Sequence, residues 1–230
     1  DYKHNIVEGL FASLMNKRLD ELTNSAAPPF TYGYSFYGGT FARNKKGYQS
    51  MAMCQEDKQL SALKVLVTEN ERVKKFGFTQ GELDRSKAQF LATVEKAYND
   101  KNKINSVSYV GQYQSNFLEN EPAPGIEWTY QTMKQLIPLI ELKDVNSLIG
   151  TYLKEDNRVV IFTGPEKDGL KKVTEQQVLD ALKTDTNTLT PYKDEHVVLS
   201  LIRNDVRAGT IVKRENNSKI GTKTLILSNG

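Results

Sequence analysis

The sequence holds few side chains that could combine into a metal site. Metal ions in proteins are bound by several converging His, Cys, Asp or Glu side chains. The 230 residues include two histidines, His4 and His196, and one cysteine, Cys54. These three are far apart in the sequence, and no pair of histidines is spaced by one helical turn. We therefore expect this chain alone to bind no metal or other cofactor, and we interpret both histidines as surface or linker residues.

Patterns typical of nucleophilic or nucleotide chemistry are also weak. Residues 61–64 (Ser-Ala-Leu-Lys) match the S-x-x-K pattern of penicillin-binding enzymes, but neither S-D-N nor K-T-G accompanies them. Leu60 and Leu63 explain the same stretch as the buried side of a helix. The sequence contains no G-x-S-x-G, P-loop or G-x-G-x-x-G pattern. We therefore predict no catalytic, cofactor-binding or metal-binding residue in this chain.

Composition argues against nucleic acid and membrane as partners. The 31 basic and 28 acidic residues are interspersed and leave a net charge of +3, which produces little steering field. Tyr32, Tyr34 and Phe36 could stack on bases, but no basic groove is interleaved with them, so we interpret them as a half-buried strand face. No apolar run reaches the roughly 18 residues that span a membrane. Cys54 cannot form an internal disulfide and is interpreted as a small core residue.

The best-defined structural element is a helix predicted over residues 77–100. Thr79 and Glu82 have the spacing of a capping box, in which each side chain binds a backbone N–H that the helix start leaves unpaired. Phe78 and Leu83 have the spacing of a hydrophobic staple across the same helix start. Apolar residues then recur on one side of the helix, which predicts one buried face.

Upstream, the pattern predicts a helix followed by a β-hairpin. Residues 4–23 place apolar side chains on one stripe of an amphipathic helix. Two alternating runs within residues 32–54, separated by a short turn that contains glycine, indicate a hairpin. Gly38 and Gly39 predict a bulge or a close backbone approach. Asp57 is positioned to cap the helix that follows.

Downstream, the sequence predicts further helices and one more strand in the sheet. Helical spacing recurs in three segments, which are residues 104–118, 128–137 and 145–153. Arg158 to Thr163 is a β-branched apolar run bounded by Gly164 and Pro165, which is typical of a buried strand. Thr174 and Gln177 form a second candidate capping box for a helix that ends near Leu182.

Residues 183–221 are polar and irregular, and only Val197 to Ile202 is apolar enough for a strand. Together with the hairpin and the helices, the predicted strands indicate an α+β fold with several helices packed on a mostly antiparallel sheet.

Four motifs in order resemble one protein family. They are LFASLMNKRLDEL (residues 10–22), APPFTYGYSFY (27–37), ENERVKKFGFTQGELDRSKAQFLATVEKA (69–97) and RVVIFTGPEK (158–167). In this order and spacing they resemble a module of the pitrilysin-like zinc metallopeptidases, the relatives of insulin-degrading enzyme and the mitochondrial processing peptidases. In that family the motif H-x-x-E-H supplies two zinc-binding histidines and a general base. This chain has no such motif, so the resemblance implies a non-catalytic module.

The resemblance also implies a division of the chain. Residues 1–184 are similar to the non-catalytic module, residues 185–221 are predicted to be a linker, and residues 222–230 resemble the start of the next module. Modules of this kind place a strand before their first helix, and no such strand precedes Asp1. The resemblance therefore implies that the module lacks its first strand and has an unpaired sheet edge, through which it could associate with another chain.

The function implied by the resemblance belongs to a longer protein. We expect a fragment of a zinc-dependent metallopeptidase that cleaves peptides, with zinc in the parent protein and none bound by the fragment. The module would shape the chamber that encloses an unfolded peptide substrate and would dock the zinc-bearing module of the same polypeptide. It would be inactive alone. The expected location is the bacterial cell envelope or periplasm, where members of the family are found.

Two alternatives remain open on the sequence. A non-enzymatic assembly subunit, similar to the core subunits of the respiratory bc1 complex, would share the fold without peptidase activity. An unrelated helical binding domain would lack the alternating hairpin of residues 32–54.

Overall fold

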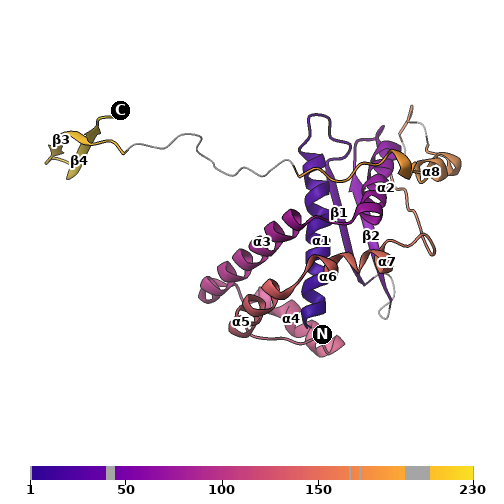
Figure 1. Ribbon diagram of the computed structural model, residues 1–230, viewed down its shortest axis with the longest axis horizontal. Helices are drawn as coiled ribbons and strands as arrows, with labels where there is room; N and C mark the ends of the chain where they lie inside the picture. The colour runs from indigo at the N-terminus through magenta and orange to yellow at the C-terminus, as the bar shows by residue number, and fades with distance from the viewer. Residues whose placement is uncertain (1, 40–44, 166, 171, 195–207, 230) are drawn as a thin grey trace. The chain divides into compact units, whose positions relative to one another are not determined.

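The computed structural model describes residues 2–39, 45–165, 167–170, 172–194 and 208–229. The chain divides into two compact units, Asp1–Lys193 and Asp194–Gly230, which are described separately (Figure 1). No helix among the described residues is long and apolar enough to cross a membrane.

Helix α1 (Tyr2–Thr23) is the centre of the first unit and packs on a β-hairpin (Figure 1). Strands β1 (Tyr32–Gly39) and β2 (Lys46–Met53) are antiparallel, as predicted. The Asn16 side chain binds the backbone of Ser35 twice: Nδ2 donates to the carbonyl at 2.9 Å, and Oδ1 accepts from the N–H at 2.7 Å. A side chain of α1 thus satisfies both backbone groups of one strand residue and attaches the helix to the hairpin.

The hairpin register is regular, which corrects one prediction. Gly38 pairs with Gly47 and Gly39 with Lys46 without any shift, so the predicted bulge is absent there. The close approach occurs instead at Gly33, where an added Cβ would lie 2.6 Å from the ring of Phe30. The glycine that the packing requires is therefore the one at the start of β1.

Helices α2 (Gln59–Phe76) and α3 (Gln80–Asn99) follow the hairpin and are joined by a tight turn (Figure 1). The capping box of Thr79 and Glu82 is confirmed, with both reciprocal hydrogen bonds present. The predicted cap of α2 is wrong: its N-cap is Lys58, which makes no side-chain cap bond, and not Asp57. In the turn, Gly77 has a φ of 71°, in the left-handed region that favours glycine.

The remaining helices of the first unit are the 3₁₀ turn η1 (Lys101–Lys103), α4 (Val107–Glu119), α5 (Ile126–Leu136), η2 (Ile137–Leu139), α6 (Leu142–Asn146), α7 (Ile149–Tyr152), α8 (Glu175–Ala181) and η3 (Thr186–Thr188). Among them, α5, η1 and η2 pack on α3, α6 packs on α1, and α7, α8 and η3 pack on α2. The second predicted capping box, formed by Thr174 and Gln177 at the start of α8, is confirmed.

The main core of the first unit surrounds Phe11 of α1. The Phe11 ring makes edge contacts with Phe78 at 5.2 Å, Tyr152 at 5.1 Å and Tyr48 at 6.2 Å between ring centroids. These rings come from the α2–α3 turn, α7 and β2, so one side chain of α1 joins three separate segments. A smaller core around Leu19 and Phe30 includes the half-buried Cys54 at its margin.

The segment Arg158 to Thr163 is not the buried strand that its sequence predicts. It forms no strand, and Val159 and Ile161 are 81% and 67% exposed. A β-branched run forms a strand only where a partner offers hydrogen bonds and a surface to pack on. The hairpin does not provide that partner among the described residues, since its sheet has the order β1-β2.

The second unit is a small hairpin. Strands β3 (Ile211–Asn217) and β4 (Thr222–Leu227) are antiparallel, with an irregularity between Ile211 and Lys213, and every residue of both strands is exposed. Strand β3 falls within residues 185–221, the segment predicted to connect two modules, and it pairs with β4. The predicted strand from Val197 to Ile202 lies outside the described residues.

The fold class is confirmed as α+β, with helices packed on an antiparallel hairpin. The alternative of a purely helical domain is wrong, because β1 and β2 form the predicted hairpin.

We expect the stability of the first unit to fall between about pH 10 and pH 12. Burial raises the pKa of Tyr48 from 10.0 to about 12. Burial, and then the hydrogen bond to Glu8, also raises the pKa of Tyr152. The unfolded chain loses these protons first, so the free energy of unfolding should decrease above pH 10 by about 1 to 3 kcal/mol. Urea unfolding at a series of pH values measures this decrease.

The matched variants are Tyr48→Phe and Tyr113→Phe, the latter at a tyrosine that is 63% exposed. Tyr48→Phe should reduce the slope of stability against pH above pH 10, and Tyr113→Phe should leave it unchanged. Equal slopes in the two variants would contradict the assignment.

Candidate functional site

A buried ion pair joins α1 to the start of α3. Nε and Nη2 of Arg18 donate to the Glu82 carboxylate at 2.6 and 2.9 Å, and Nη2 also donates to the Gly77 carbonyl at 3.1 Å. The two side chains are 2% and 5% exposed. Glu82 simultaneously accepts from the Thr79 backbone at 2.8 Å, so its role in the capping box orients it for Arg18. A carboxylate and a guanidinium held in this way neutralise each other's charge inside the core.

Residues 186–193 lie across this ion pair as a strap. The guanidinium carbon of Arg18 is 4.4 Å from the ring centroid of Tyr192 and 5.0 Å from that of Phe78. Tyr192 donates its hydroxyl to Glu21 at 2.7 Å, and Arg72 donates to the Thr190 carbonyl. The strap therefore covers a cation between two aromatic rings.

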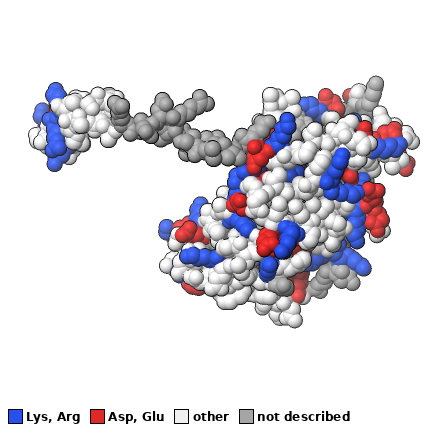
Figure 2. Space-filling view, viewed as in Figure 1, with Lys and Arg blue, Asp and Glu red and all other residues white. Residues whose placement is uncertain are grey.

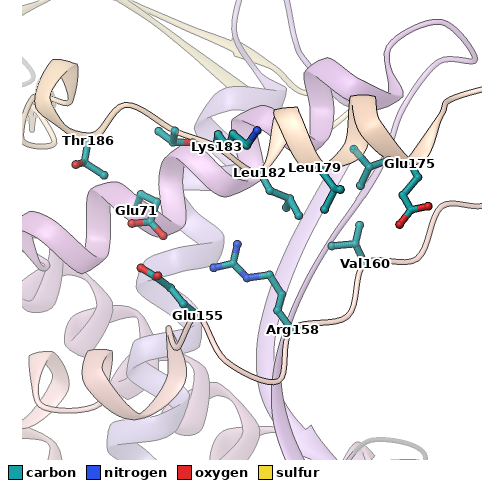
Figure 3. Close-up of a pocket in the computed structure, with 11 residues that line it drawn as sticks. Glu71, Glu155, Arg158, Val160, Glu175, Leu179, Leu182, Lys183 and Thr186 are labelled. Carbon is teal, nitrogen blue, oxygen red and sulfur yellow. The ribbon is translucent and has the colours of Figure 1, made fainter.

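A groove lies between α2, α8 and the chain that follows α7 (Figure 3). Its volume is about 730 Å³, within the range of about 300 to 1,000 Å³ typical of ligand sites. Apolar side chains of α8 and the opposite chain meet in it, among them Leu179, Leu182 and Val160. Arg158 and Glu155 stand on the same side, and the hydrogen bond from Lys74 lowers the pKa of the Glu155 carboxyl. Charged side chains of both signs, among them Glu71, Arg158 and Lys183, thus line the groove beside its apolar residues.

The outer face of the hairpin is an apolar surface. Tyr32 is opposite Met53 and Tyr34 is opposite Met51, and these four side chains are between 37% and 67% exposed. The rings of Tyr32 and Tyr34 stack at 6.2 Å with an angle of 11° between their planes. Tyr32, Tyr34, Met51 and Met53 thus form an exposed ladder of rings and thioethers, whereas Phe36, also expected on a half-buried strand face, is half-buried. Charges on the face of the first unit seen in Figure 2 are interspersed in sign, as the composition indicates.

The residues considered for chemistry in the sequence are not brought together. Nε2 of His4 lies 3.3 Å from the Glu8 carboxylate, and Cys54 lies at the hairpin end, where burial raises the pKa of its thiol. The Ser61 hydroxyl donates to the Lys58 carbonyl within α2, as expected for a helix residue. His196 lies outside the described residues. Among the residues that the structure describes, no three His, Cys, Asp or Glu side chains form a group that could hold a metal.

Sequence reasoning missed Arg18 and the strap. The available signal was the position of Arg18 on the apolar stripe of α1, four residues after Leu14 and seven after Phe11. A charged residue on a buried face requires a partner, but the partner is 64 residues away and no spacing rule identifies it.

Comparison with known proteins finds similarity to proteases in sequence and in structure. No family model matches the sequence. A zinc protease PQQL-like of Arabidopsis thaliana is 25% identical over 232 residues, covering 100% of this chain and 21% of that protein. The periplasmic protease PqqL of Escherichia coli has a similar structure, with a TM-score of 0.67 and 21% identity over 98% of this chain and 25% of that one. A predicted insulinase family protease from Yersinia pestis gives a TM-score of 0.62 and 11% identity, over 79% of this chain and 38% of that one.

These comparisons support the resemblance to the pitrilysin-like family and show a shared fold. The fold similarity and the Arabidopsis relative agree with the four ordered motifs of the sequence. The module spans about a fifth of the length of the Arabidopsis relative. It carries no H-x-x-E-H motif in its 230 residues.

Removing one partner of the buried pair should destabilise the first unit strongly. Arg18→Met leaves the Glu82 carboxylate buried without its cation, which should cost about 3 to 5 kcal/mol. The double variant Arg18→Met with Glu82→Leu removes both charges and should be more stable than Arg18→Met alone. Urea unfolding of the single and double variants measures the coupling.

The matched control is Lys17→Met, the adjacent residue of α1, whose ion pair with Asp20 is exposed. This variant should unfold at nearly the same urea concentration as the parent chain. A double variant less stable than Arg18→Met would contradict the view that the pair serves mainly to neutralise two buried charges.

Proposed function

We propose that this chain is a structural module of a zinc-dependent metallopeptidase that cleaves peptides, and that it is catalytically silent alone. The observation that carries the proposal is the similarity of the whole chain to a zinc protease, combined with a sequence that lacks H-x-x-E-H. Zinc hydrolysis needs several ligands and a general base around one ion. In this proposal, zinc belongs to the parent protein and another module supplies its ligands.

The module would contribute the wall of a substrate chamber. The exposed ladder of Tyr32, Tyr34, Met51 and Met53 offers an apolar surface without charge, as contact with an unfolded peptide of variable sequence requires. Aromatic rings and methionines suit such contacts because they bury large area and adapt to different partners. The helices of the first unit support this hairpin from its opposite face.

Other modules of the same polypeptide are the proposed neighbours. We propose that residues 1–184 form the module, that residues 185–221 connect it to the next one, and that residues 222–230 begin that next module, with β4 as part of its first strand. The module would also associate with another chain through an edge of its sheet. The periplasmic location of PqqL from E. coli supports the cell envelope as the compartment.

The second candidate function is a non-enzymatic assembly subunit with the same fold. The discriminating observation is the sequence of the parent gene: H-x-x-E-H in another module favours the peptidase, and its absence throughout favours the assembly subunit.

The isolated chain should not hydrolyse peptides. We expect no cleavage of an unstructured fluorogenic peptide by the purified 230-residue chain, with or without added zinc, because no zinc-binding motif is present. Mass spectrometry of the peptide after long incubation is the second readout. Turnover that a chelator abolishes, and that persists across separate purifications, would sink the proposal.

A further inference from the structure

Two basic side chains of α2 hold the strap of residues 186–193 by its backbone (Figure 1). Nζ of Lys75 donates to the Thr186 carbonyl at 2.6 Å, and Nη1 of Arg72 donates to the Thr190 carbonyl at 2.5 Å. Both bonds are exposed, so water competes for the same donors and acceptors. Each bond therefore adds little net stability, and the strap depends on several contacts together.

Tyr192 attaches the end of the strap to α1. Its ring centroid lies 4.4 Å from the guanidinium carbon of Arg18, and its hydroxyl donates to Glu21 at 2.7 Å. The other partners of the guanidinium, Glu82 and the Gly77 carbonyl, belong to α3 and to the turn before it. Release of Tyr192 therefore leaves these hydrogen bonds, and the core that they position, in place.

The strap is also loosely packed. Each of residues 186–193 is half-buried or exposed, and none is fully buried. A pocket of about 280 Å³ lies against the strap, with residues 190–193 on one side and residues of α1 and α2 on the other. Segments that bury few side chains and make solvent-exposed hydrogen bonds open at a lower free energy than the whole domain unfolds. The strap has both properties.

We propose that the strap opens as one segment while the rest of the first unit stays folded. The last attached residue then moves back from Lys193 to Asp185. The eight released residues add up to roughly 26 to 29 Å of extended chain between the two units. The closed strap shortens the reach of the second unit, and the open strap extends it.

Chymotrypsin cleavage after Tyr192 measures the opening directly. The S1 pocket of this protease takes an apolar ring, so the ring must leave Arg18 before the bond is cut. The full chain should be cut there about 10- to 100-fold more slowly than a synthetic peptide of residues 186–198. The rate should depend little on urea below the unfolding transition, because opening exposes little surface. Mass spectrometry follows this product at each urea concentration.

Variants at the two ends of the strap test whether it opens as one segment. Glu21→Met removes the acceptor of the Tyr192 hydroxyl and should speed cleavage after Tyr192 by about five- to tenfold. Lys75→Met removes the bond at the other end and should speed the same cleavage by a similar factor, because the whole strap detaches together. The matched controls are the neighbouring charged residues: Asp20→Met and Lys74→Met should leave the rate unchanged.

Energy transfer between the two units tests the change in length. In a Cys54→Ser background, dyes on Ser61→Cys and Ser218→Cys report from α2 and from the turn between β3 and β4. Glu21→Met combined with Lys75→Met should leave the strap open in a large share of molecules and lower the mean transfer efficiency. The two control substitutions together should leave the efficiency at the value of the parent chain.

Cleavage after Tyr192 that follows the urea dependence of global unfolding overturns the proposal, since the strap would then detach only with the core. Cleavage as fast as that of the free peptide overturns it as well, because the strap would not be closed. A rate that Lys75→Met leaves unchanged contradicts opening as one segment, and equal transfer efficiencies contradict the change in length. None of these measurements needs peptidase activity, so the peptide assay tests the proposed function separately.

Discussion

The buried pair of Arg18 and Glu82 is the constraint on which the first unit depends. A guanidinium and a carboxylate that are both almost fully buried must stay together, because either alone in the core carries a large desolvation cost. Their contact fixes α1 against the start of α3, and the bond to the Gly77 carbonyl fixes the turn between α2 and α3 as well. The position of Phe78, and through it the core around Phe11, follows from this arrangement.

The same pair explains why residues 186–193 belong to the first unit. Arg18 has one nitrogen, Nη1, without a hydrogen-bond partner among the described residues, and the ring of Tyr192 lies over its guanidinium. An aromatic face is a suitable neighbour for a cation whose hydrogen bonds are incomplete. The strap therefore packs on α1 and α2. Its residues, up to Lys193, are part of the first unit.

The sequence predicted the elements whose signals are local. The predicted capping boxes at Thr79 and Thr174 are confirmed, because a capping box joins residues that are three apart in the sequence. The predicted hairpin is confirmed, because its two strands are adjacent in the chain. Arg158 to Thr163 failed because strand formation depends on a partner that composition does not reveal. The pairing of Arg18 with Glu82 across 64 residues was unpredictable for the same reason, although an arginine on an apolar stripe signals that some acidic partner exists. The groove beside α8 could not be predicted from the sequence, because it is lined by segments that are distant in the sequence and adjacent only in the fold.

The distribution of exposed apolar surface argues for a module that works in contact with other protein. The outer face of the hairpin and the side chains of Val159 and Ile161 are apolar and exposed. In contrast, the core side chains of α1, such as Phe11, Leu10 and Met15, are almost completely buried. A self-contained soluble domain rarely leaves apolar side chains in contiguous groups on its surface. The core around α1 is closed, so the apolar surface left on the hairpin and at Val159 and Ile161 is the part of the first unit that is suited to contact with other protein.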